Sequence, residues 1–135
     1  MGAKETIQRM FSSRIETGEH HPDESLQTHY YKAMKDKVFD ELQAMFDQKQ
    51  GYEVKSISPE HGEMIVDVKH GKKAFMVITV IMVRPYRTAV DFSINTDTIL
   101  FSDFGYSAKL ARTLYKELNE RLTFIGTALG SELGT

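Results

Sequence analysis

The stretch AFMVITVIMV, residues 74–83, decides the fold of this chain because nearly every position in it is apolar. Thr79 is its only polar residue. A strand with one dry and one wet face alternates apolar with polar side chains, and this stretch does not. It therefore predicts a central strand whose two faces both need cover.

The composition bounds the class of protein. The 135 residues suffice for one domain, and a net charge of −2 gives no global attraction to nucleic acid or to an anionic membrane. The chain has no cysteine, so disulfides and thiolate chemistry are excluded. Its longest apolar run has ten residues, whereas a bilayer span needs about 20. We expect a cytoplasmic protein with no cofactor, no nucleic-acid partner and no membrane partner.

The pattern divides into an N-terminal arm (1–22), a single domain (23–126) and a flexible tail (127–135). Helical spacing predicts a helix over about 23–48 that begins at an Asp23 N-cap, with the apolar stripe Leu26, Tyr30, Met34, Val38, Leu42, Met45 and Phe46. A second helix is predicted over about 107–124, with Ser107 as candidate N-cap and the stripe Leu110, Leu114, Leu118, Leu122 and Ile125.

Four strands are predicted between the helices, at about 52–58, 62–69, 73–84 and 88–96. Two-residue turns at His70-Gly71 and Pro85-Tyr86 and a short loop at 59–61 would join them in an antiparallel meander. A short fifth strand or an extended connection is predicted at 98–101. The expected fold is a two-layer α+β domain, a four-stranded antiparallel meander with two helices on one face, in the order α-β-β-β-β-α.

These turns also predict which side chains point away from the helices. The pairings Val66 with Phe75, Ile81 with Val90 and Val54 with Val66 turn strand 73–84 so that an apolar ridge faces outward. We call this set the predicted ridge: Ile65, Met76, Ile78, Val80 and Met82.

The predicted ridge indicates an interaction surface. It would be covered by a second copy of the chain, by the N-terminal arm with Ile7, Met10, Phe11 and Ile15, or by a ligand or peptide. The leading interpretation is a self-associating or partner-docking module without enzyme activity, most simply a homodimer.

A polar cluster supports the alternative of a small-ligand or metal-binding module, with the possibility of a minor enzyme. Its candidate residues, if they come together in space, are His20, His21, His29, Asp103 and Tyr106. Histidine with carboxylate suits a divalent metal. However, His20 and His21 are adjacent and diverge in most backbones, and no HExxH motif is present, so no metal site is predicted.

The segment HHPDESLQTHYY, residues 20–31, together with DFGY at 103–106, resembles small cytosolic proteins of unknown function from Gram-positive bacteria. The resemblance covers most of the chain from about Ile15. It implies a cytoplasmic bacterial protein and transfers no catalytic residue.

Overall fold

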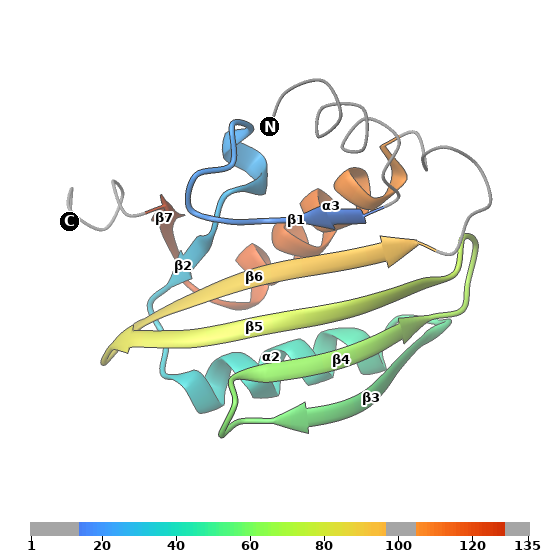
Figure 1. The fold of residues 1–135 in the computed structure, drawn as a ribbon. Coiled ribbons are helices and arrows are strands. Elements are labelled where there is room, and N and C mark those ends of the chain that lie inside the picture. The colour runs from blue at the N-terminus through green and yellow to red at the C-terminus, as the bar shows by residue number, and fades with distance from the viewer. Residues whose placement is uncertain (1–13, 97–104, 129–135) are drawn as a thin grey trace.

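The computed structural model describes residues 14–96 and 105–128 and shows one sheet with two α-helices (Figure 1). Most of the strands are joined by short loops, and the two helices lie before and after the central strands. In chain order the elements are β1 (Arg14–Glu16), the 3₁₀ helix η1 (Glu24–Leu26), β2 (His29–Tyr31), α2 (Lys35–Asp47), β3 (Tyr52–Ser58), β4 (Glu63–Val68), β5 (Ala74–Arg84), β6 (Arg87–Thr96), α3 (Tyr106–Arg121) and β7 (Phe124–Thr127).

All strand pairings among the described residues are antiparallel, in the order β3-β4-β5-β6-β2-β7. Strand β1 also pairs with β6, so β1 and β2 share one edge of β6. The α+β class and the 52–96 meander are confirmed. The sheet has seven strands rather than the predicted four, because three short segments outside the meander extend it beyond β6.

Both helices cover the same face of the sheet, and the core lies between the two layers (Figure 1). Helix α2 contributes Val38, Leu42 and Phe46, all fully buried, as its predicted stripe requires. Helix α3 contributes Leu114 and Leu118 in the same way. No helix of the described residues is long and apolar enough to cross a bilayer.

The single helix predicted over 23–48 is wrong in its first half. Asp23 does act as an N-cap, and its carboxylate accepts from the Ser25 N–H, but only for the one-turn helix η1. The chain then extends as β2, whose backbone pairs with β6 and β7, and α2 begins only at Lys35. Aromatic Tyr30 and Tyr31 fit a strand as well as a helix, and sheet pairing overrides the helical spacing there.

The second helix is one residue longer at its start and ends three residues earlier than predicted. Its N-cap is Gly105, in the left-handed conformation, and Ser107 is buried within the first turn. The chain leaves the helix at Leu122 and forms β7, which pairs with β2. The possible strand at 98–101 lies outside the described residues.

The orientation predicted for β5 is wrong, because both of its registers differ by one residue from the prediction. Residues 69–73 form a longer loop than a two-residue turn, so Val66 lies opposite Met76. At the other end the Pro85-Tyr86 turn is retained, but a β-bulge between Met82 and Arg84 places Val80 opposite Val90. Each one-residue slip reverses a strand's faces, and β5 is apolar on both, so its pattern could not exclude either register.

Part of the predicted N-terminal arm and the first residue of the predicted tail belong to strands of the sheet. Residues 14–16 form β1, whose Ile15 packs against the core, and Thr127 belongs to β7. The arm residues Ile7, Met10 and Phe11, and the tail from residue 129, lie outside the described residues.

Candidate functional site

Most of the predicted ridge lies inside the core. Met76, Ile78 and Val80 are 0–1% exposed and face the helices, so the outward placement predicted for them is wrong. Met82 is 38% exposed at the end of β5. Ile65 lies opposite Val77 on the outer face, as predicted. These residues are buried because β5 has the opposite orientation to the predicted one. The other apolar set of the strand faces outward in their place.

The outer face of β5 is nevertheless apolar. Its alternate residues Phe75, Val77 and Ile81 point away from the helices, and Phe75 and Ile81 are about half exposed, at 45% and 54%. Val83 in the bulge is also exposed. We call Ile65, Phe75, Val77, Ile81 and Val83 the outer stripe. An apolar outer face was therefore correctly expected, although mostly with the wrong residues.

The alternative histidine site is not assembled. His20 is exposed, whereas His29 is buried and stacks on Tyr115 of α3. Tyr106 begins α3 and contacts Lys72. Tyr106 lies nine residues before Tyr115 in this helix, which separates the two by about 13 Å along the helix axis. Asp103 lies outside the described residues. No group of three or more His, Asp or Glu side chains within the described ranges is arranged to hold a metal ion.

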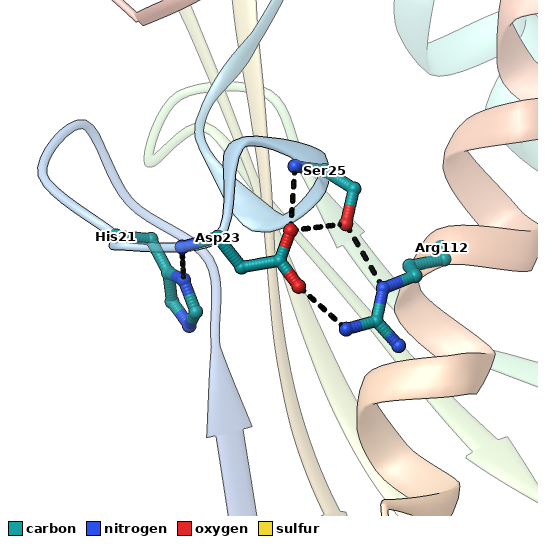
Figure 2. Close-up of polar contacts among 4 residues, drawn as sticks. All are labelled: His21, Asp23, Ser25 and Arg112. Carbon is teal, nitrogen blue, oxygen red and sulfur yellow. Dashed lines mark hydrogen bonds and ion pairs between the residues drawn. The ribbon is translucent and has the colours of Figure 1, made fainter.

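His21 instead belongs to a polar clamp that ties the 18–28 segment to α3 (Figure 2). Its Nδ1 accepts from the Asp23 N–H at 3.0 Å. The Asp23 carboxylate accepts from the Ser25 N–H at 3.0 Å and from Arg112 Nη2 at 2.6 Å, while Arg112 Nε donates to Ser25 Oγ at 2.9 Å. Hydrogen bonds from Ser25 and Arg112 lower the pKa of Asp23 to about 2. These hydrogen bonds hold the 18–28 segment against α3, and the polar groups of the clamp bond to one another.

His29 is held neutral in the folded chain. Its Nδ1 lies 2.7 Å from the Gln27 carbonyl oxygen, which can only accept, so Nδ1 carries the proton. Its ring lies 3.5 Å from the Tyr115 ring, nearly parallel to it. Burial lowers the pKa of His29 to about 4. These contacts make His29 a core residue, and they leave it unsuited to bind a ligand from solvent.

A second polar group, centred on Asp91, was not predicted from the sequence. Asp91 lies in the middle of β6, on the outer face, where β1 and β2 diverge. Its carboxyl group lies 2.6 Å from Thr17 Oγ1 and accepts from Thr28 Oγ1 at 2.9 Å. We call Thr17, Thr28, Asp91 and Tyr115 the Asp91 cluster. Thr17 and Thr28 are buried and flank the loop that leaves the sheet between β1 and β2, so this loop partly buries Asp91.

A proton count shows which form of Asp91 fits the cluster. Three oxygen contacts follow in a row: Asp91 Oδ1 to Thr17 Oγ1, Thr17 Oγ1 to Tyr115 Oη at 2.9 Å, and Tyr115 Oη to the Val90 carbonyl at 2.8 Å. The carbonyl has no proton, so Tyr115 donates to it and Thr17 must donate to Tyr115. With Asp91 ionised, Thr17 donates to the carboxylate and Tyr115 has one proton for either Thr17 or the Val90 carbonyl, so all three contacts are hydrogen bonds at once only when Asp91 is protonated. Thr17 also accepts from the Phe92 N–H, which completes its capacity.

The surroundings of Asp91 favour its protonated form more than water does. Burial raises the pKa of Asp91 above its ordinary value and the negative charge of Glu19 adds to this shift, whereas the hydrogen bonds that Thr17 and Thr28 donate to the ionised carboxylate oppose it. The hydroxyl of Tyr30 donates to Glu19 Oε1, whereas Glu19 Oε2 is buried without a hydrogen-bond partner among the described residues. A cavity of about 260 Å³ adjoins the cluster, lined by Glu16, Thr17, Thr79, Asp91, Phe92 and Ser93.

The sequence offered one signal for this cluster. Thr28 falls in the segment 20–31 noted in the sequence, but Asp91 follows the alternation of β6 and would have been solvated in a four-stranded sheet. Only the additional strands at the edge of β6 bury it. Chemically, the cluster can hold one proton on Asp91 and fasten β1, β2 and β6 to α3.

Comparison with known protein families, curated proteins and solved structures finds no match for this chain.

Proposed function

We propose that the chain is a self-associating module and that two copies pack through the outer faces of their sheets. One observation carries this proposal. Seven large apolar side chains of the described residues are exposed, and five of them belong to β5 or to the turn after it: Phe75, Ile81, Met82, Val83 and Tyr86. Exposed apolar side chains scattered singly need no explanation, but four of these five are grouped at the end of β5 and in the turn after it, with Phe75 further along the same strand, and such a group favours an interface.

The outer face is large enough for a pair of sheets. Strands β3 to β6 have 7, 6, 11 and 10 residues. With about 3.3 Å of rise per residue and about 4.8 Å between strands, their outer face covers roughly 540 Å². Two copies would bury about 1,100 Å² in total, which reaches the lower bound of about 1,000 Å² for a specific interface.

A second copy suits this face better than an unrelated partner. The outer stripe runs along the centre of the β3–β6 meander, and a two-fold contact brings the same stripe from each copy together. Sheets pack face to face when their inner surfaces are apolar, with the strands about 30° apart. The net charge of −2 imposes little repulsion between two copies.

Sedimentation equilibrium of the full chain at micromolar concentrations tests the proposal. We expect the wild type to be a dimer and Ile81→Lys to be a monomer with an unchanged circular-dichroism spectrum, because Ile81 is outward and exposed. Gln43→Lys adds the same charge to an exposed position of α2 and should remain dimeric. A monomeric wild type, or a dimer that tolerates Ile81→Lys, would overturn self-association through this face.

A further inference from the structure

The turn between β5 and β6 contains a backbone conformation that its sequence does not favour. Arg84 and Arg87 pair across a two-residue turn formed by Pro85 and Tyr86. Proline fixes its own φ near −65°, while Tyr86 has a φ of +62°. A negative φ followed by a positive φ is the type II pattern, in which the second residue is normally glycine or asparagine.

Tyr86 therefore occupies a position where a side chain carries a cost. A residue other than glycine in the left-handed region is strained, and bulky residues rarely adopt it. Tyr86 contacts Met34 through its backbone, whose N–H donates to Met34 Sδ at 3.4 Å. Glycine could make that contact without strain. Strain of this kind is typically kept where it serves a function.

The Tyr86 side chain is also the most exposed large apolar group of the described residues, at 61%. Met34, Ile81, Met82 and Val83 lie with it at this end of β5 and are exposed too. Beside them, a cavity of about 300 Å³ lies between the β3–β4 turn and β5. Its lining residues include Lys35 of α2, His61 of the turn, and Ile81 and Met82 of β5. One end of the sheet thus carries both a projecting aromatic side chain and a hollow.

We infer that Tyr86 is the anchor of the self-association interface and that it enters the cavity beside Ile81 and Met82 of a second copy. This inference rests on the proposed function. The projecting Tyr86 and the hollow lie at the same end of the sheet, next to the start of α2, and a two-fold contact at this end lets each copy supply both parts. Tyrosine is enriched among the residues that dominate binding energy, and it loses little side-chain freedom on binding.

The decisive variant is Tyr86→Gly, because it separates the fold from the interface. Glycine removes the backbone strain and the aromatic ring together. We expect the dimer to dissociate at least tenfold more readily, while the urea midpoint of the dilute monomer is unchanged or higher. Tyr86→Phe keeps the ring at the same backbone position and should retain the wild-type affinity.

A second variant tests the receiving cavity. His61 lies on an exposed turn, so His61→Phe can occupy the hollow without disturbing the core. We expect weaker dimerisation with an unchanged urea midpoint. If the affinity is unchanged, the cavity does not receive Tyr86 and the inference is overturned.

The outcomes distinguish this inference from the proposal beneath it. A monomeric wild type removes the proposed function and the anchor together. A wild-type dimer that Ile81→Lys disrupts but Tyr86→Gly leaves intact retains the interface and removes the anchor. A lower urea midpoint for the dilute Tyr86→Gly monomer would show that the turn needs Tyr86 for folding, which also overturns the inference.

Discussion

The outer face of the sheet contains two neighbouring regions with opposite characters. Along β5 it is apolar and exposed, with Phe75 and Ile81 about half accessible. Between β1 and β2 it is polar and partly buried, with Asp91 hydrogen-bonded to Thr17 and Thr28. Thr17 and Thr28 each form a hydrogen bond with Asp91, whereas the exposed apolar groups have no such cover among the described residues. The described chain thus supplies hydrogen-bond partners for Asp91 and no cover for Phe75 and Ile81.

The largest expected effect tests which side of β5 faces the core. Ile78→Ala should lower the free energy of unfolding by about 3–4 kcal/mol, because Ile78 is fully buried and its loss leaves a cavity. Val77→Ala, one residue away on the outer face, should cost less than about 1 kcal/mol. Urea unfolding at low protein concentration measures both. Equal costs would contradict the orientation of β5.

The next largest expected effect is a loss of stability at acid pH, caused by the buried His29. Because the folded pKa of His29 is about 4 and the ordinary value is 6.5, the unfolded chain binds more protons between these values. The wild type should therefore lose about 2–3 kcal/mol of stability as the pH falls from 6.5 to 4. His29→Phe, which retains a ring against Tyr115, should lose that component. A pH profile shared by wild type and variant would argue against a neutral, buried His29.

Asp91 should make stability depend on pH with the opposite sign to His29, so that its contribution falls as the pH rises. Its folded pKa lies above its ordinary value of 3.8, so its contribution is complete at lower pH and is lost as the pH rises through the folded pKa. Asp91→Asn mimics the protonated acid, with an amide that donates to Thr17. We expect equal stability near pH 4 and a variant more stable than the wild type by about 1 kcal/mol at higher pH. A carboxyl carbon of Asp91 that titrates at or below 3.8 in NMR would refute the proton count.

The clamp of Figure 2 should have the smallest effect, because its charged partners are 45% and 40% exposed. Arg112→Ala should cost less than about 1 kcal/mol at neutral pH. Since the folded pKa of Asp23 is lowered to about 2, the contribution present at neutral pH is lost as the pH falls toward that value. Arg112→Lys, which cannot form both contacts, should behave like the alanine variant. A larger cost would mean that the 18–28 segment depends on this clamp.

Comparison of β5 with β6 shows why one strand could be oriented from the sequence and the other could not. Strand β6 alternates, so Val90, Phe92 and Ile94 identify its inner face and are buried as expected. Strand β5 is apolar on both faces, so only the turn lengths could set its register. A longer loop at one end and a bulge at the other changed both registers by one residue. The three predicted turns agreed on which strand faces point toward the helices. They would agree equally well with both registers of β5 moved by one residue, which turns this strand over.

The sequence alone determined the α+β class, the 52–96 meander, the apolar stripes of α2 and α3 within their observed bounds, and an apolar strand face that the described residues leave exposed. These features follow from local periodicity, which a single segment carries within itself. The tertiary structure alone decided the orientation of β5, the strands β1, β2 and β7, and the burial of Asp91. Each of these depends on pairing between segments distant in the chain, and no local pattern encodes which distant backbone will accept a strand's hydrogen bonds.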